Sequence, residues 1–238
     1  MRLRFQTACL AVLLVAVSGA AGLLRALDDI RPQVTAEAEP PWLPPAAVVR
    51  PLFLGYHALA ADLFWIRTVQ YFGGHIQTDR RYPHLYRLVD LTTSLDPHFL
   101  DAYQLGGLFL VIGRAYPEAI AIYRKGIEHN PGRWELPHDL ARMYFLELGD
   151  IPAALEWFQR TDGLPGRPHY VPRFVARLQA RLGLVEAALE MWEQMLETTD
   201  NEWVRETAEQ EIRRLRARQR RAAGAAAPAP RPGGGGPR

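Results

Sequence analysis

The sequence contains a single cysteine, Cys9, among its 238 residues. One cysteine cannot form an intrachain disulfide, and it cannot supply the several thiolates that a cysteine-based zinc site needs. Lysine is equally scarce, because Lys125 is the only one. Neither sign of charge is in excess: 28 Lys and Arg against 26 Asp and Glu give a formal net charge of +2. This balance indicates no particular class of charged partner.

Motifs of catalytic and metal sites are also missing. The sequence has no Gly-rich phosphate loop, no nucleophile elbow and no CxxC pair. Its seven histidines include no i, i+4 pair and no ligand pattern such as HExxH. We therefore predict that the protein is not an enzyme and that it holds no metal and no cofactor.

An apolar run extends from Ala8 to Leu24 and follows the basic residues Arg2 and Arg4. A positive end followed by such a run directs a chain to a membrane. The length of the run favours an uncleaved signal-anchor, whereas the small residues 18–20 leave cleavage by signal peptidase open. With an anchor we expect a single-pass protein of a bacterial inner membrane whose remainder is periplasmic or extracytoplasmic. With cleavage we expect an exported protein.

Composition divides the chain into six segments. The spacer is rich in proline, and the tail of Ala, Pro and Gly cannot bury enough apolar surface to fold. We predict a signal-anchor or signal peptide at 1–27, a spacer at 28–51, a divergent leading helix pair at 52–97, three repeats at 98–200, a capping helix at 201–221 and a disordered tail at 222–238.

Three prolines, Pro97, Pro131 and Pro165, recur every 34 residues. A fixed period of this length is typical of stacked helix–turn–helix units, none of which buries its apolar face without a neighbour. One glycine is expected in the turn inside each unit, where a positive φ is least strained. These turn residues are Gly113, Gly149 and Gly183.

Small residues recur at the positions where such helices would touch. The first helices carry Gly107, Ala141 and Ala176, and the second helices carry Ala119, Ala154 and Ala188. Four residues after each of these alanines stands an aromatic residue: Tyr123, Phe158 and Trp192. This pattern resembles the tetratricopeptide repeat (TPR) family from Tyr82 to Leu196, with about one extra residue before Gly149. The resemblance implies an all-α, TPR-type helix–turn–helix solenoid with a capping helix, and the whole layout is similar to membrane-associated bacterial repeat proteins.

In this family the first helix of each unit builds the concave wall. The resemblance therefore implies a partner-binding surface that exposes Asp101, Gln104, Leu108, His138, Arg142, Phe145, Arg173, Arg177 and Arg181. The last three are spaced i, i+4, i+8, and like charges at this spacing cost a few tenths of a kcal/mol per pair unless they are neutralised. An acidic peptide or a free C-terminal carboxylate would neutralise them through bidentate contacts. Solvation by water, or pairing with a carboxylate on a neighbouring helix (Asp139, Glu135 or Glu147), would also offset the repulsion between these arginines.

The apolar segment 52–72 predicts one long helix that ends at the glycine pair 73–74. Asp62 and Arg67 interrupt it, so it is a poor membrane span and a good buried helix. Buried charges need partners, and these two are expected to pair with residues of adjoining helices such as Arg87 or Asp90. The alternative is a polar site around Asp62 and Arg67 in an accessory subunit of a membrane enzyme.

The arginines between 213 and 221 are expected on a solvated face of the capping helix, or against anionic lipid. No aromatic residues interleave with them, so we predict no nucleic-acid partner. Together these expectations describe a membrane-tethered scaffold for protein–protein interaction. It would bind a peptide or partner subunit, which could be acidic, during assembly of an envelope complex.

Overall fold

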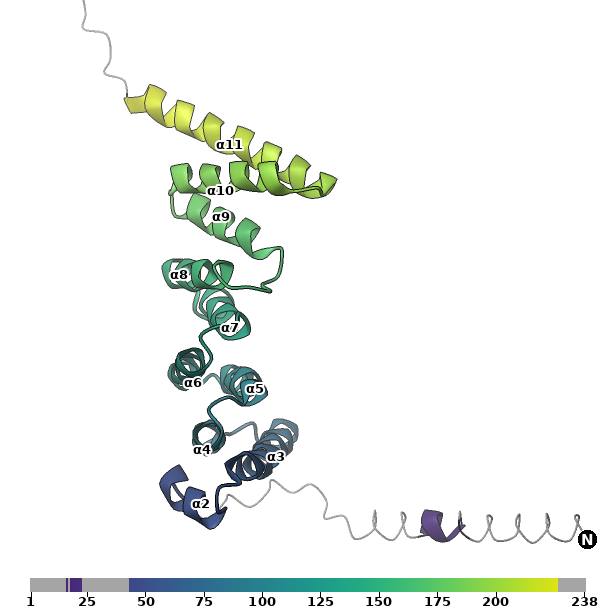
Figure 1. Ribbon diagram of the computed structural model, residues 1–238. Coiled ribbons are helices and arrows are strands. Elements are labelled where there is room, and N and C mark those ends of the chain that lie inside the picture. The colour runs from purple at the N-terminus through teal and green to yellow at the C-terminus, as the bar shows by residue number, and fades with distance from the viewer. Residues whose placement is uncertain (1–15, 17, 23–42, 227–238) are drawn as a thin grey trace, which may run out of the picture.

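The computed structural model describes residues 16, 18–22 and 43–226. All regular elements within these residues are helices, and from residue 43 onwards they stack into a column with α2 at one end and α11 at the other (Figure 1). The helices are α2 (Ala46–Leu52), α3 (His57–Gln77), α4 (Leu85–Leu95), α5 (Leu100–Ile112), α6 (Tyr116–His129), α7 (Glu135–Met143), the π-helical turn η1 (Tyr144–Leu148), α8 (Ile151–Asp162), α9 (Val171–Arg181), α10 (Val185–Thr198) and α11 (Glu202–Ala226).

The helices pack mainly on their neighbours in sequence, and helices α3, α5 and α7 lie on one side of the column while α4, α6 and α8 lie on the other (Figure 1). Contacts also join α3 to α5, α5 to α7 and α4 to α6. Each helix pair therefore buries its apolar seam against the next pair, as in a solenoid of repeats. The described chain is an all-α array of helix pairs.

The predicted small residues lie at the seams between these helices. Ala141 and Ala176 of the first helices have no exposed surface, and neither do Ala119 and Ala188 of the second helices. Gly107 is buried as well, and a Cβ atom there would lie 2.5 Å from the Tyr123 ring. The small residues thus set how closely the helices approach each other.

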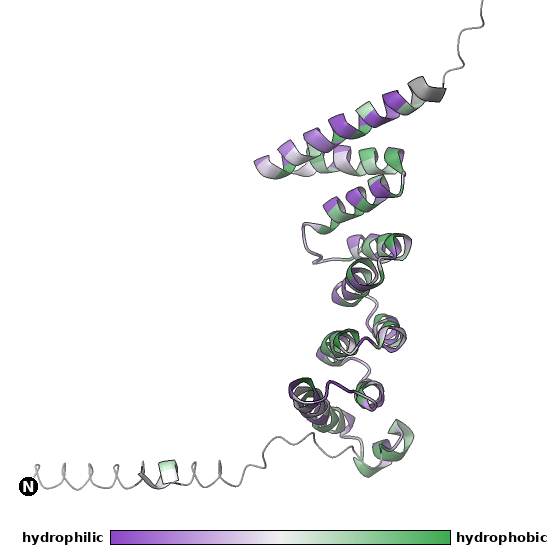
Figure 2. Ribbon diagram, turned by 180° about the vertical axis from the view of Figure 1, so that it is seen from behind, coloured by the Kyte–Doolittle hydropathy of each residue, from purple (hydrophilic) through white to green (hydrophobic). Residues whose placement is uncertain are grey.

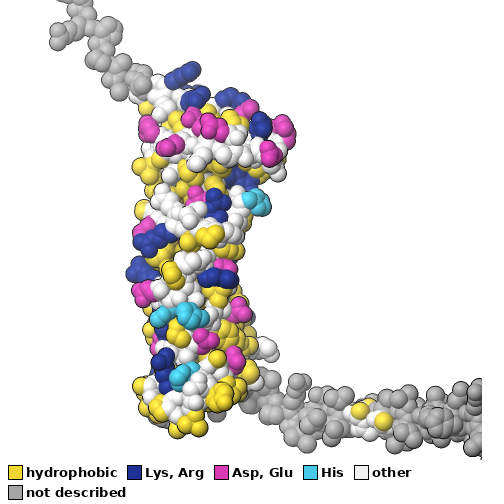
Figure 3. Space-filling view, in the orientation of Figure 1, with side chains coloured by type: hydrophobic (Ala, Val, Ile, Leu, Met, Phe, Trp, Pro, Cys, Tyr) yellow, Lys and Arg dark blue, Asp and Glu magenta, His cyan; other side chains and the backbone are white. Residues whose placement is uncertain are grey.

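The two ends of the column differ in character. Helix α11 buries Ala208, Ile212 and Leu215 against α10, and its remaining surface is largely hydrophilic (Figure 2). Hydrophobic side chains gather instead at the end that α2 forms (Figure 3). This polarity fits α11 to cover the end of the stack, as terminal repeats commonly do.

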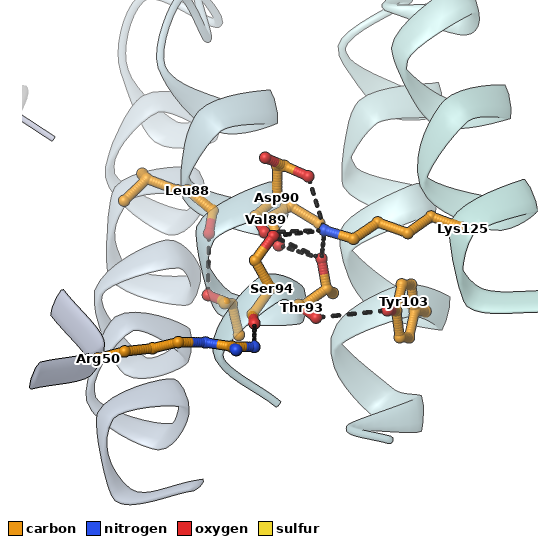
Figure 4. A network of polar contacts seen from close by, with 9 residues as sticks. Arg50, Leu88, Val89, Asp90, Thr93, Ser94, Tyr103 and Lys125 are labelled. Atoms are coloured by element: carbon orange, nitrogen blue, oxygen red, sulfur yellow. Dashed lines mark hydrogen bonds and ion pairs between the residues drawn. The ribbon is translucent and has the colours of Figure 1, made fainter. Parts of the chain in front are cut away.

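A polar network joins α2, α4 and α6 (Figure 4). The Lys125 ammonium group donates to Asp90 Oδ1 at 2.7 Å, to Ser94 Oγ at 2.7 Å, to Thr93 Oγ1 at 3.0 Å and to the Asp90 carbonyl at 3.1 Å. Arg50 of α2 donates to the Ser94 carbonyl at 2.6 Å. The only lysine of the chain therefore links α6 to α4 through hydrogen bonds.

Several helix bounds differ from the expectation. Helix α2 lies partly inside the segment expected as a spacer, and α3 runs through the glycine pair 73–74 to Gln77. It continues because His75 and Ile76, beyond the glycines, still pack inward. Helix α11 likewise continues to Ala226, past the expected start of the tail at 222, and residues 227–238 lie outside the described residues.

The turn glycines follow the prediction at two of three positions. Gly149 and Gly183 have φ angles of 65° and 82°. Gly113 instead has a φ of −73°, and the following residue, Arg114, takes the left-handed conformation at 60°. The first turn therefore places its positive φ one residue later than predicted.

The predicted location in a membrane is corrected. Among the described residues, no helix combines the length and the apolar character needed to cross a bilayer. This finding contradicts the expected single-pass inner-membrane protein. Most of the N-terminal apolar run, and with it the expected signal-anchor or cleavage site, lies outside the described residues, as does the spacer up to residue 42.

Candidate functional site

Three hollows follow one another along the chain, between successive first helices. The first lies between α5 and α7, the second between η1 and α9, and the third between α9 and α11. Their volumes are about 440, 170 and 700 Å³, respectively. We call them the α5–α7 hollow, the aromatic hollow and the α9–α11 cleft.

The α5–α7 hollow carries a net negative charge. Three carboxylates and one guanidinium group line it: Asp101, Asp139, Glu147 and Arg142. Asp139 accepts a hydrogen bond from Gln104 Nε2 at 3.3 Å, and Arg142 lies 3.5 Å from its other oxygen. Burial raises the pKa of the Tyr123 hydroxyl in the same hollow. The hollow is therefore suited to a basic or neutral polar group.

The aromatic hollow has a wall of five rings. They come from α7, η1, α8, α9 and the segment before α9: His138, Phe145, Phe158, Phe174 and Tyr170. The Phe174 ring centroid lies 5.4 Å from that of Phe145 and 5.1 Å from that of Phe158. His138 Nε2 and the Tyr170 hydroxyl share a hydrogen bond of 2.7 Å. A hollow of this size and character has room for one apolar or aromatic side chain.

The extra residue of the second repeat lies beside this hollow. The segment Tyr144–Leu148 forms the π-helical turn η1, and the Asp150 amide donates back to the Tyr144 carbonyl at 3.0 Å. A π-turn absorbs one additional residue within a helix and often occurs at functional sites. Here it brings Phe145 and Leu146 to the aromatic hollow, and Leu146 borders the α5–α7 hollow as well.

The α9–α11 cleft is lined by arginines of two helices. Arg177 and Arg181 come from α9, and Arg214, Arg218 and Arg221 come from α11. Between them the buried Trp192 of α10 is 1% exposed. Glu211 is the single carboxylate among the side chains that line this cleft. The cleft therefore carries a strongly positive charge, opposite to that of the α5–α7 hollow.

The structure distributes the predicted surface residues over all three hollows. Gln104 and Arg142 border the first, Arg142 and Phe145 the second, and Arg177 and Arg181 the third. These placements leave their role in binding a prediction.

Two predicted surface residues differ from the expectation. His138 is only 6% exposed, because it packs among the rings of the aromatic hollow. Arg173 places its guanidinium 4.7 Å from the Trp203 ring centroid, in a cation–π contact. Partial burial, together with the nearby charge of Arg177, lowers the pKa of Arg173.

The carboxylates expected to neutralise the α9 arginines have other partners. Asp139 pairs with Arg142, and Glu135 pairs with Arg133 at 2.7 Å. Glu147 accepts a hydrogen bond from the Tyr116 hydroxyl at 3.3 Å. The arginine row on α9 is therefore not neutralised in the way that the sequence suggested.

The two groups that the sequence offered as partners of Asp62 and Arg67 have other contacts in the structure. Arg87 donates to the Leu43 carbonyl at 3.1 Å and Asp90 pairs with Lys125, so both expected partners are engaged elsewhere. Asp62 is exposed on the outer face of α3, and neither Asp62 nor Arg67 borders the three hollows. Helix α3 is thus buried on one face only, because Leu59, Leu63 and Ile66 are also exposed.

Sequence reasoning missed the contribution of α11 and of Tyr170. The spacing of Arg214, Arg218 and Arg221, i, i+4, i+7, does place them on one helical face and was a usable signal. Nothing in the sequence indicated that this face would meet the α9 row across a cleft. Among the described residues, no group of three or more His, Cys, Asp or Glu side chains is arranged to hold a metal ion.

Comparison with known proteins finds similar solved structures of low sequence identity. No protein-family model matches this sequence, and a search of curated proteins finds no match. A crystal structure of a MamA protein is similar over 74% of this chain and 100% of its own, with 16% identity and a TM-score of 0.43. A thermophilic TPR protein from Thermus thermophilus is similar over 74% of this chain and 94% of its own, with 18% identity and a TM-score of 0.38.

The helix pairs define the class of fold. Helix pairs with small residues at their seams make the described chain an all-α helical repeat, which agrees with the predicted resemblance to the TPR family at the level of fold. The comparisons add no information about partner, location or activity.

Proposed function

We propose that this protein is an interaction scaffold that binds an extended segment of a partner protein along its first helices. The observation that supports this most directly is the aromatic hollow, whose volume of about 170 Å³ matches a single large side chain. Scaffolds of this kind commonly present long surfaces for peptides and seldom enclose a catalytic pocket.

The neighbouring hollows would extend the contact on both sides. The α5–α7 hollow is net negative and the α9–α11 cleft is positive, so a bound segment would find an apolar anchor point between two charged ones. Anchor residues in apolar pockets usually contribute most of the binding energy, while flanking charges set register and partner choice.

The proposal is tested by site-specific photo-crosslinking in intact cells. A photo-crosslinking amino acid replaces Leu146, which is 61% exposed and borders two of the hollows. The matched control carries the same amino acid in place of Glu190, an exposed residue of α10 that borders none of the three. We expect adducts with one or a few proteins from position 146 only, identified by mass spectrometry.

Two substitutions then connect the adducts to the chemistry of the hollow. Phe145→Glu introduces a charge into the aromatic wall, and Arg142→Glu changes an exposed charge at its edge. Phe145→Glu should abolish the adducts, whereas Arg142→Glu makes the α5–α7 hollow more negative and should leave them in place. The far-UV circular dichroism spectrum of both variants should stay unchanged. Equal labelling from positions 146 and 190, or adducts that survive Phe145→Glu, would refute the proposal. The identity of the captured proteins also shows whether the partner belongs to an envelope complex.

A further inference from the structure

The arginines of the α9–α11 cleft form two rows on opposite walls. Arg177 and Arg181 are one turn apart on α9, and Arg214, Arg218 and Arg221 follow one another on one face of α11. Both helices pack on α10 and scarcely touch each other, which leaves an open cleft of about 700 Å³ between them.

Two arginines of α11 outside the cleft have close carboxylate partners, and those inside it do not. Outside the cleft, Arg213 lies 3.4 Å from Glu209, and Arg216 lies 2.7 Å from Glu193 of α10. Inside the cleft, Arg214 has only a distant contact with Glu211 at 3.8 Å.

The remaining four cleft arginines have no carboxylate partner. Arg218 donates to the Ala180 carbonyl at 3.2 Å, but none of Arg177, Arg181, Arg218 and Arg221 has a carboxylate within 4.0 Å among the described residues. Four guanidinium groups without a carboxylate partner therefore line the cleft, and positive charge is concentrated there.

The cleft combines this charge with an apolar lining. Ala180, Trp192, Leu215 and Ala217 contribute the apolar side chains between the two rows. Charge-assisted contacts are stronger near apolar walls than in open water, and guanidinium groups bind carboxylates in a bidentate manner. An anionic ligand would also relieve the repulsion between like charges one turn apart on each helix.

We propose that the α9–α11 cleft binds an extended run of acidic residues in the partner protein, an inference that rests on the proposed scaffold function. Successive side chains of an extended chain point to opposite sides. Consecutive Glu or Asp residues would therefore reach the α9 row and the α11 row in turn. A nucleic acid fits less well, because Trp192, the aromatic residue that lines the cleft, is buried and offers no face for a base to stack on.

The test measures binding of a fluorescein-labelled peptide of eight glutamates to the full-length protein by fluorescence anisotropy. We expect saturable binding that weakens steeply between low and physiological salt, because exposed charges are screened. An octaglutamine peptide should not bind. Arg177→Glu/Arg181→Glu and Arg218→Glu/Arg221→Glu should each weaken binding of the acidic peptide at least tenfold.

The matched control is Arg213→Glu/Arg220→Glu, which makes the same change of net charge on α11 outside the cleft. It should change the affinity less than twofold, and unchanged thermal melting of all three variants shows that the fold is intact. Equal loss in the control would overturn the proposal, since attraction by net charge alone would then suffice. Absence of acidic-peptide binding would overturn it too, as would preferred binding of single-stranded DNA or of phosphatidylserine vesicles.

This result is separable from that of the photo-crosslinking experiment. Adducts from position 146 that persist in the Arg218→Glu/Arg221→Glu variant, together with no binding of octaglutamate, contradict the acidic-run proposal and leave the scaffold proposal intact. If position 146 gives no adducts in the protein without further substitutions, the scaffold proposal itself is contradicted.

Discussion

At the scale of single residues, the absence of a side chain determines how closely some helices approach. Gly107 of α5 faces Tyr123 of α6, and a Cβ atom at position 107 would lie 2.5 Å from the ring. Tyr123 is 3% exposed, and its ring would have to shift to admit this atom. Gly73 of α3 is different, because a Cβ atom there meets nothing within 4 Å.

Gly107→Ala is expected to destabilise the protein by about 1–3 kcal/mol, since an added methyl group overpacks a buried seam. Gly73→Ala, also in a helix, should leave stability unchanged or raise it by up to about 1 kcal/mol, because alanine restricts the unfolded chain. Urea unfolding followed by circular dichroism measures both. A destabilisation of the same size in the two variants would contradict the seam geometry.

At the scale of helices, one cation joins elements that pack side by side. The Lys125 ammonium group of α6 has four oxygen acceptors on α4, and Arg50 of α2 binds the same part of α4 (Figure 4). A lysine suits this arrangement because its three rotatable donors diverge from one nitrogen toward acceptors that surround it, whereas the fork of arginine spreads its donors in one plane. The network therefore fixes α4 between its neighbours.

Lys125→Met keeps the aliphatic stem and removes the charge, and we expect a loss of about 1–3 kcal/mol of unfolding free energy. Lys125→Arg should restore only part of this loss. The control is Arg213→Met, which removes an exposed ion pair with Glu209 and should change stability by less than about 1 kcal/mol. Equal denaturation midpoints for Lys125→Met and the original protein would show that water replaces the ammonium group without loss.

Much of this arrangement of helices follows from sequence periodicity, and the exceptions have physical causes. The spacing of Gly107, Ala141 and Ala176 predicted the seams, because small residues are needed wherever two helices touch. The extent of α3 past its glycine pair was not predictable from local signals, since tertiary packing of His75 decides it.

The candidate site was predicted in part. The first-helix positions are set by the repeat, so Gln104, Arg142 and Phe145 could be placed on one side of the array. The α9–α11 cleft could not, because it depends on how far α11 stands from α9. The sequence does not indicate that two rows of arginines on separate helices will face each other.

At the scale of the whole molecule, the buried core is divided along the column. One cluster extends from Leu43 to Leu178 and unites most helix pairs. A second cluster lies between α9, α10 and α11, around Trp192 and Ile212, and the partly buried Met191 contacts both. In arrays whose units touch only their neighbours, stability is a sum of local terms, and one end can open while the rest stays folded.

Ile212→Ala should therefore loosen the C-terminal end selectively. Removing this buried side chain costs about 2–5 kcal/mol locally, because a cavity replaces packed methyl groups. In hydrogen exchange followed by mass spectrometry, we expect faster exchange in α10 and α11 and unchanged exchange in α4, α5 and α6. Ile122→Ala, in the larger cluster, should instead speed exchange in α4, α5 and α6 and leave α10 and α11 unchanged.

Uniformly faster exchange in both variants would mean that the array unfolds as a single cooperative unit. The α9–α11 cleft would then open only together with the rest of the column, and its affinity for acidic segments would depend on the stability of the whole protein.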